Sequence, residues 1–416
     1  MSKNVMNDKQ TPAYGNSAKT AAGFAGPTPV SIVTIALALS GCAELMALFF
    51  IQPLLPKLAS EYAIPVSHVS IILSAETALL ALGLLFTGTL SDRFGQKRLI
   101  VTSLLVGGLL TILCPLATSW TQLVILRALI GLCLSGIAAA ATSYISEEVA
   151  PAMAGIVTGY FVFGNSIGGM SGRVIASQLM DIVPLSSIFF VFGAILMAVG
   201  AFVAVFLPKC RNTSVANSLN LMAVIRGGTE HFRNLNISLF FVISFVIFGT
   251  FTSLYNFMAF YLHNAPFNVS FASAGLISTC FVLSFITAPQ AGKLALKFGE
   301  MNVLAVMLGM MIVGIILTAL ATAAWFFIIG VVLFTAAFFG CHAIGLAWVS
   351  KNASRAKGQA TAFYLFFYYM GGSVVGYISG LIFAAFGWTG LAICLATLLV
   401  GGIGITRILQ SRIIAI

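Results

Sequence analysis

Five ionisable side chains stand inside long apolar stretches of this 416-residue sequence: Glu44, Glu76, Arg127, Arg173 and His342. Each stretch is long enough to cross a bilayer as a helix. A charged side chain at the centre of a bilayer costs about 2.5–3.5 kcal/mol on insertion scales, so each of these residues needs a structural or functional reason. The chemistry available to such a set is ion pairing, or the loading and release of a proton on an acid.

Four of these charges are predicted to lie at a similar depth. At about 1.5 Å of rise per residue, Glu44, Glu76, Arg127 and Arg173 fall about 9–13 Å from the outer ends of their segments. In the structural interpretation the two acids and two arginines neutralise one another. In the functional interpretation Glu44 or Glu76 alternates between water and Arg127, because desolvation favours the protonated acid and a nearby arginine favours the carboxylate. Both interpretations stay open, and Arg173 is expected to be structural.

The elements that must position these residues are membrane-spanning helices. Hydrophobic residues make up 60% of the sequence and charged residues only 7%, which excludes a soluble globular protein. Twelve spans are predicted, at residues 30–51, 67–90, 99–117, 120–143, 153–179, 186–208, 236–261, 270–293, 302–322, 325–349, 358–384 and 389–406. They predict a polar cytoplasmic tail (1–28), two six-helix bundles (29–208 and 236–408) joined by a cytoplasmic linker (209–235), and a short cytoplasmic tail (409–416).

The two bundles show signs of a duplication. The segment Gly88–Gly95 shares four of eight residues with Gly292–Gly299, which lies 204 positions later and also between two apolar runs. The pair Gly168-Gly169 is repeated as Gly371-Gly372, at a separation of 203. The sequence therefore predicts two related halves.

The basic residues predict the orientation. With both termini in the cytoplasm, 17 of the 20 Lys and Arg residues lie on the cytoplasmic side. Lys57 lies outside, and Arg127 and Arg173 lie within spans. The excess of positive charge therefore reflects topology, and no nucleic-acid partner is expected. The seven cysteines form no CxxC pair, so neither a metal site nor a cofactor is predicted.

Aromatic and polar residues suggest where a substrate would bind. Tyr364 and Tyr368 share one face of span 358–384 and could present rings and hydroxyl groups to an apolar or cationic compound. Tyr255 and Asn256 are weaker candidates of the same kind. His342 is expected to be packed and hydrogen-bonded, although it could also titrate near neutral pH.

Small residues crowd the span at 153–179, where Gly164, Asn165, Gly168 and Gly169 lie close together. Such residues let helices approach closely. They predict either ordinary tight packing or a surface on which the two halves meet and slide.

Several of these segments resemble the major facilitator superfamily. Gly88 to Arg98, with Asp92, Arg93 and Gly95, resembles its cytoplasmic loop signature, with Gln96 in place of the usual Arg. The segment around Arg127 is similar to a fourth-span motif of drug:proton antiporters, and Gly164 to Gly169 to their fifth-span motif, with Asn165 where Pro is usual. The runs containing Glu147 and Glu148 and residues 164–173 are similar to AraJ/YnfM-like bacterial inner-membrane transporters.

The resemblance implies an all-α fold of twelve transmembrane helices in two pseudo-symmetric six-helix bundles. Spans 1, 4, 7 and 10 would line a central cavity, while spans 2, 5, 8 and 11 would form the interface between halves. It also implies that Asp92 latches onto the start of span eleven, near Arg355 or Lys357. Arg93 or Arg98 would then pair with Glu147 or Glu148.

The functional expectation is a secondary transporter of the bacterial inner membrane, not an enzyme. It would export a small amphipathic molecule in exchange for protons by alternating access, and would work as a monomer. Proton-coupled uptake of a metabolite is the alternative that the same fold supports. A membrane sensor or scaffold without transport is a third possibility.

Overall fold

The computed structural model describes residues 30–210, 232, 234–353 and 357–414. Within these ranges the chain forms helices joined by short turns, and it contains no β-strand. The first half consists of α1 (Val30–Phe49), α2 (Leu55–Glu61), α3 (Val66–Val69), α4 (Ile71–Phe94), α5 (Gln96–Leu113), η1 (Cys114–Leu116), α6 (Trp120–Glu148), α7 (Pro151–Leu179) and α8 (Leu185–Phe206). The second half consists of α10 (Leu235–His263), α11 (Phe271–Leu276), η2 (Ile277–Leu283), α12 (Ser284–Phe298), α13 (Glu300–Ala319), α14 (Ala324–Asn352) and α15 (Lys357–Ile414).

The helices match the predicted spans closely. By length and composition, 10 helical segments of the described chain could cross a membrane. The last of them lies within α15, which turns sharply at Gly387, where φ is 64°, and so provides two passes. This turn falls in the predicted gap between the last two spans. With the 29-residue α7, the structure supplies all twelve predicted passes.

One predicted span is less regular than expected. Residues 270–293 were expected to form a single α-helix, but the structure breaks the segment into α11, the 3₁₀ helix η2 and α12. Pro289 lies beyond this break, inside α12, where it removes a further backbone hydrogen bond from the segment. The composition therefore predicted the crossing and missed its local geometry.

The backbone supports the predicted repeat. Gly95 and Gly299 both adopt a positive φ, of 84° and 88°, and both N–H groups bond to the carbonyl four residues earlier. This conformation favours glycine, because a Cβ atom would be strained there. Beside them, the Arg93 guanidinium lies 5.4 Å from the Phe94 ring, and the Lys297 ammonium lies 5.0 Å from the Phe298 ring. The same turn is therefore built twice, 204 residues apart.

The glycines of α7 pack the first half together. A Cβ atom on Gly164 would lie 2.1 Å from the Ala38 carbonyl oxygen, and one on Gly168 would lie 2.0 Å from that of Cys42. Both contacts are with α1, so these two glycines serve tight packing within one half and do not form a surface between halves. Gly169 does face the second half, because a Cβ there would contact the Phe281 ring at 3.7 Å.

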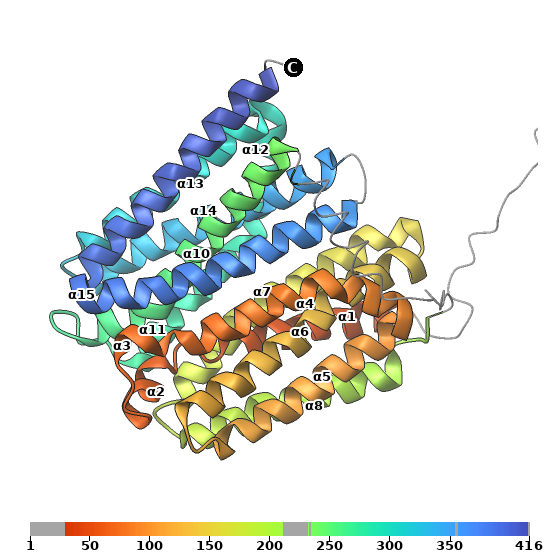
Figure 1. Cartoon of the computed structure of the whole chain (residues 1–416), viewed down its shortest axis with the longest axis horizontal. Coiled ribbons are helices and arrows are strands. Elements are labelled where there is room, and N and C mark those ends of the chain that lie inside the picture. The colour runs from red at the N-terminus through yellow and green to blue at the C-terminus, as the bar shows by residue number, and fades with distance from the viewer. Residues whose placement is uncertain (1–29, 211–231, 233, 354–356, 415–416) are drawn as a thin grey trace, which may run out of the picture.

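The two halves touch at one end of the molecule. There α15 packs on α3 and α4, and α7 packs on α11 and η2, as the family resemblance implied for the interface spans. A Cβ atom on Gly275 would lie 1.9 Å from the Ser177 hydroxyl, and one on Gly380 would lie 2.6 Å from the Ser67 carbonyl oxygen. We call this the closed end. In Figure 1 the halves converge at the left, where α2, α3 and α11 lie.

At the opposite end, the halves diverge (Figure 1). Nothing lies within 4 Å of a Cβ atom built on Gly88, Gly155, Gly159 or Gly292. This open end is where α1 begins and where α15 ends. The structure is thus a wedge that is sealed at one end and separated at the other.

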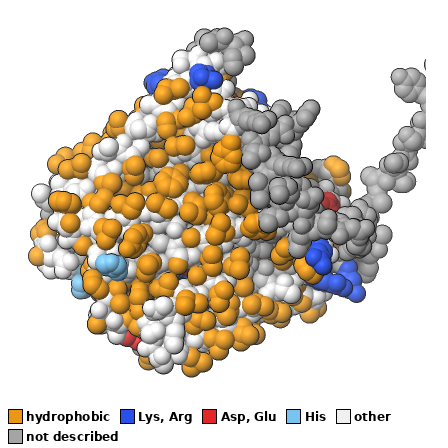
Figure 2. Space-filling view, viewed as in Figure 1, with side chains coloured by type: hydrophobic (Ala, Val, Ile, Leu, Met, Phe, Trp, Pro, Cys, Tyr) orange, Lys and Arg blue, Asp and Glu red, His pale blue; other side chains and the backbone are white. Residues whose placement is uncertain are grey.

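The outer surface suits a bilayer. Large apolar side chains are exposed along the helices, including Leu296 at 88% and Phe386 at 73%. Figure 2 shows hydrophobic side chains spread over the face of the molecule, with Lys and Arg gathered toward its edges at the top and right. Exposed apolar area of this extent is costly in water and favourable in lipid.

The α1–α7 contact gives a test of the packing. We expect Gly168→Ala to destabilise the folded protein by about 1–3 kcal/mol, because the added methyl group overlaps the Cys42 carbonyl oxygen. Gly159→Ala, on the same helix but with open space around it, should be neutral or slightly stabilising. Unfolding of the purified variants in mixed micelles measures both, and equal effects would contradict the packing.

Candidate functional site

A buried ion pair joins α4 to α6. Glu76 and Arg127 are both 0% exposed, and Nη2 of Arg127 donates to Oε2 of Glu76 and, at 3.0 Å, to the carbonyl oxygen of Ala47. The guanidinium also lies 4.9 Å from the ring of Phe50. Gly131 makes the approach possible, because a Cβ atom there would lie 2.0 Å from the Glu76 carbonyl oxygen. The predicted pairing of an acid with Arg127 is therefore found for Glu76.

This ion pair has no counterpart in the second half. The positions 204 residues later are Cys280 and Val331, which carry no charge. There the Tyr255 hydroxyl lies 3.2 Å from the Cys280 sulfur and 2.8 Å from the Thr335 hydroxyl. The two halves share a backbone plan, but only the first has an acid–arginine pair at this place.

Glu44 is buried without an arginine. It is 2% exposed, it has no ion-pair partner among the described residues, and its Oε2 makes no hydrogen bond there. No ion pair joins it to Arg127 or Arg173 in the described part of the chain. The interpretation in which both acids neutralise the arginines is therefore found for Glu76 and not for Glu44.

Arg173 is held by a different set of groups. Its Nε donates to Oε1 of Gln52 at 2.6 Å, and its Nη1 donates to the Gly169 carbonyl oxygen at 2.6 Å. Nε2 of Gln52 donates in turn to Oδ1 of Asn256 at 2.7 Å. The rings of Phe49 and Phe281 lie 4.0 Å and 4.7 Å from the guanidinium.

Gln52 was not among the predicted site residues. Its only signal in the sequence is a polar side chain directly after the first apolar run, a position that usually reaches solvent at the membrane surface. In the structure the Gln52 side chain is only 1% exposed, because the chain turns there into α2 and packs against the second half.

The predicted substrate residues form two groups, which the rings of Phe251 and Phe338 connect. Phe251 lies 4.8 Å from Tyr255, and Phe338 lies 3.8 Å from Phe251 and 6.4 Å from His342. In one group, the Tyr364 hydroxyl lies 3.4 Å from Nδ1 of His342, and the His342 and Tyr368 rings are 4.5 Å apart. His342 is thus packed and hydrogen-bonded, as expected. Tyr255 and Asn256 lie with Arg173 instead. Both tyrosines of the first group are largely buried, at 1% and 8% exposure.

The predicted gating loop is only partly described. The side chains of Asp92 and Lys357, and the whole of Arg355, lie outside the described residues, so the proposed Asp92 latch is untested. Glu147 accepts a hydrogen bond from Gln96 at 2.8 Å. Its observed partner is therefore Gln96, where Arg93 or Arg98 was expected. The equivalent pair in the second half is Lys351 with Glu300, at 3.2 Å.

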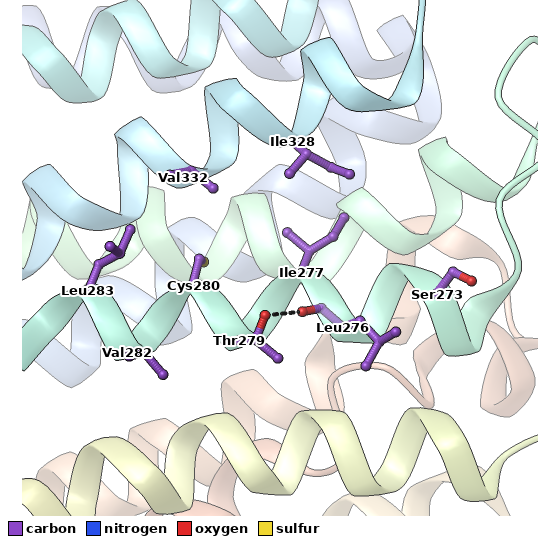
Figure 3. A pocket seen from close by; sticks show the side chains of 9 residues that line it. All are labelled: Ser273, Leu276, Ile277, Thr279, Cys280, Val282, Leu283, Ile328 and Val332. Carbon is purple, nitrogen blue, oxygen red and sulfur yellow. Dashed lines mark hydrogen bonds between the residues drawn. The ribbon is translucent and has the colours of Figure 1, made fainter.

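Two cavities lie within the second half. One, of about 470 Å³, lies between η2 and α14 and is mostly apolar (Figure 3). Thr279 lines it, but its hydroxyl is engaged with the Leu276 carbonyl oxygen at 2.7 Å. The other, of about 510 Å³, lies at the open end and is lined by Asn234, Lys351 and other polar residues. Neither cavity lies between the halves, so the buried polar groups between them remain the candidate site.

Comparison with known proteins identifies the family. The sequence profile of the Major Facilitator Superfamily matches residues 37–265 and 237–411, which together span nearly all of the described chain. The chain belongs to this superfamily. It is therefore a multi-pass membrane protein of a family of transporters, and not of a family of enzymes.

Several known proteins are similar to this chain in sequence. The inner membrane transport protein YnfM of Escherichia coli K12 is 37% identical over 375 residues, which cover 88% of this chain and 88% of that protein. An uncharacterized transporter of Buchnera aphidicola from Schizaphis graminum is 33% identical over 86% of this chain and 87% of its own length. The multidrug resistance protein MdtG of Proteus mirabilis is 30% identical over a shorter stretch, 58% of this chain and 60% of the relative.

Solved structures show the same fold. The nucleoside transporter NupG has a TM-score of 0.75 at 13% identity and covers 91% of this chain and 99% of its own. A bacterial homologue of the lysosomal transporter Spinster, in an inward-facing and occupied conformation, has a TM-score of 0.75 at 13% identity, over 92% and 97% of the two chains.

The residues at the equivalent positions of the second half provide a test of the Glu76–Arg127 ion pair. Arg127→Val should destabilise the protein by about 3–5 kcal/mol, because it leaves the Glu76 carboxylate buried without its partner. The double variant Glu76→Cys/Arg127→Val copies the residues of the second half and should recover much of that loss. Unfolding free energies in mixed micelles test this, and a double variant no more stable than the single one would contradict it.

Proposed function

We propose that the protein is a secondary transporter of the bacterial cytoplasmic membrane that exports a small amphipathic molecule in exchange for protons. It works by alternating access, with the two halves rocking between the observed wedge and its reverse. One observation carries the proton coupling: the carboxyl group of Glu44 in α1 is buried inside the membrane span and has no ion-pair partner among the described residues.

Glu44 suits a proton-carrying role because its environment depends on how the halves are arranged. A buried carboxylate with no partner is costly, and protonation removes the charge. A rearrangement of the halves that admits water to Glu44 would lower the cost of releasing the proton. Glu76 is the second candidate, with Arg127 holding its carboxylate while the proton is absent.

The charge distribution supports an orientation for the wedge. Arg127 and Arg173 are buried within spans, and the other described Lys and Arg residues divide sharply. Lys57 lies toward the closed end, and those toward the open end are Arg93, Lys97, Arg98, Lys209, Lys293, Lys297, Lys351, Arg407 and Arg412. By the positive-inside rule the open end faces the cytoplasm. An exporter in this conformation would load its substrate from the cytoplasm.

The name of one relative favours export, although it describes another protein: MdtG is named for multidrug resistance. YnfM is named as an inner membrane transport protein, which gives no direction. NupG, a nucleoside transporter, shows that the fold also carries metabolites. Uptake in symport with protons is therefore the alternative, and the assay must separate the two directions.

The decisive measurement uses everted vesicles that hold a proton gradient and a panel of amphipathic compounds. A substrate should release protons from the wild-type vesicles, and Glu44→Gln should abolish that release because no proton can load at residue 44. Glu61→Gln, a change at an exposed acid of the closed end, is the matched control and should behave like the wild type.

Three results would contradict parts of the proposal. An equal response of the wild type and Glu44→Gln would remove Glu44 from the coupling and leave Glu76→Gln as the next variant. If the proton gradient drives accumulation of a compound in right-side-out vesicles, the direction of transport is uptake and not export. Transport of a compound at a rate that does not depend on the proton gradient would contradict proton coupling.

The orientation has its own test. We expect Ser60→Cys, at the closed end, to react with an impermeant thiol reagent on spheroplasts, because that end faces outward. Ser350→Cys, exposed toward the open end, should react only after the membrane is opened. Adducts located by peptide mass spectrometry distinguish these residues from the native cysteines, and the opposite pattern would reverse the topology.

A further inference from the structure

A chain of three polar side chains crosses between the halves at the closed end. Arg173 of α7 donates to Gln52, which follows α1, and Gln52 donates to Asn256 of α10. All three are buried, at 1%, 1% and 0% exposure. Two hydrogen bonds from Nε2 of Gln52 pass from the first half to the second: a short one to Oδ1 of Asn256, at 2.7 Å, and a longer one to the carbonyl oxygen of Thr252, at 3.5 Å.

The donor and acceptor groups of these side chains set the direction of the two hydrogen bonds. A guanidinium is a donor only, so the amide oxygen of Gln52 must face Arg173. The amide nitrogen of Gln52 must then face Asn256, which has to present its oxygen. Residue 256 therefore needs an acceptor at this point, and it needs no donor, because Nδ2 of Asn256 has no partner in the described part of the chain.

Arg173 adds a second contact between the halves. Phe49 of its own half lies on the guanidinium, but Phe251, Tyr255 and Phe281 all come from the second half, at 5.9 Å, 5.2 Å and 4.7 Å. No acid is paired with Arg173 among the described residues, and its Nη2 is unpartnered there. Separation of the halves would remove three of the four rings that offset the cost of burying this charge.

We propose that Gln52 and Asn256 are the positioning residues of the closed end: their hydrogen bond holds the halves together there and must break each time that end opens. Gln52 aims Arg173 into the rings of the second half, so the hydrogen bond and the cation–π contacts form and break as one unit. We call this unit the polar latch. It rests on the alternating access proposed above, but not on proton coupling or on the direction of transport.

The latch predicts a change in accessibility that needs no substrate. Ser74 of α4 is a suitable reporter because it is 6% exposed and its hydroxyl makes no hydrogen bond in the described structure. It lies at the contact with Gly376 of α15, where a Cβ atom would be 3.6 Å from the Ser74 hydroxyl. A thiol in Ser74→Cys should therefore react with a bulky maleimide only while the closed end is open.

Two substitutions at Asn256 separate the hydrogen bond from mere packing. Asn256→Leu removes the closer acceptor at nearly constant size and leaves only the long bond to the Thr252 carbonyl oxygen, at 3.5 Å. It should raise the labelling rate at residue 74 about tenfold, the effect of losing one buried hydrogen bond. Asn256→Asp keeps an acceptor for Gln52 and should stay within about threefold of the wild-type rate. The readout is the adduct at residue 74, measured on purified full-length protein in nanodiscs.

The matched control is Ser253→Ala. It removes a buried hydrogen bond of the same helix, 2.8 Å long, but one that stays within the second half because its donor is Ser379. It should leave the labelling rate unchanged. The native thiol of Cys341 is 0% exposed and reports on the fold itself, since it reacts only if the protein loses its structure.

The outcomes are distinct. A rise for Asn256→Leu alone, with Cys341 unreactive, supports the latch. Equal rates for Asn256→Leu and Asn256→Asp, or a similar rise in Ser253→Ala, would overturn it. If Asn256→Leu exposes Cys341, then Asn256→Ala takes its place under the same criteria. Because no proton gradient is used, the latch can fail while Glu44 coupling stands, and the reverse is equally possible.

Discussion

The cost of placing charge in a hydrocarbon medium governs the interior of this protein. Glu76 and Arg127 meet that cost by pairing with each other, and Gly131 supplies the close helix contact that the pairing requires. Arg173 meets it differently, through aromatic faces, a carbonyl oxygen and the amide of Gln52. Glu44 does not meet it through any described partner. The first solution lies within the first half and the second depends on rings of the second half, so the two should respond differently when the halves move.

The repeat explains why the chemistry is unequal. Both halves keep the turn at Gly95 and Gly299 and a 29-residue helix beginning 204 positions apart, at Trp120 and Ala324. The backbone plan is therefore shared, because the same turn and packing constraints apply to each copy. The side chains are free to diverge: the first half carries the intramembrane acids and arginines, and the second carries stacked aromatic rings such as Phe248 on Tyr368, 3.9 Å apart.

The packing of the two halves separates rigid contacts from movable ones. Within the first half, α7 meets α1 backbone against backbone at Gly164 and Gly168, and α15 meets α10 in the same way at Gly371, where a Cβ would lie 2.0 Å from the Phe245 carbonyl oxygen. Such contacts have little freedom to slide. The contacts between halves lie mainly toward the closed end. Many of them join side chains, such as the stacked rings of Phe163 and Phe285, 4.8 Å apart, although Gly380 also approaches the Ser67 carbonyl oxygen. Side-chain contacts can separate without disturbing either bundle. This division suits two rigid bodies that rock against each other.

The membrane class, the number and rough limits of the crossings, the internal repeat and the short set of buried charges could all be predicted from the amino-acid sequence. Hydrophobic length and the cost of buried charge are local properties, so they can be recognised residue by residue. Which charges meet became clear from the folded chain: Glu76 and not Glu44 pairs with Arg127, Gly168 packs on α1, and Gln52 joins Arg173 to Asn256. Those outcomes depend on the rotation of each helix about its axis and on contacts between residues up to 204 positions apart, which no local pattern specifies.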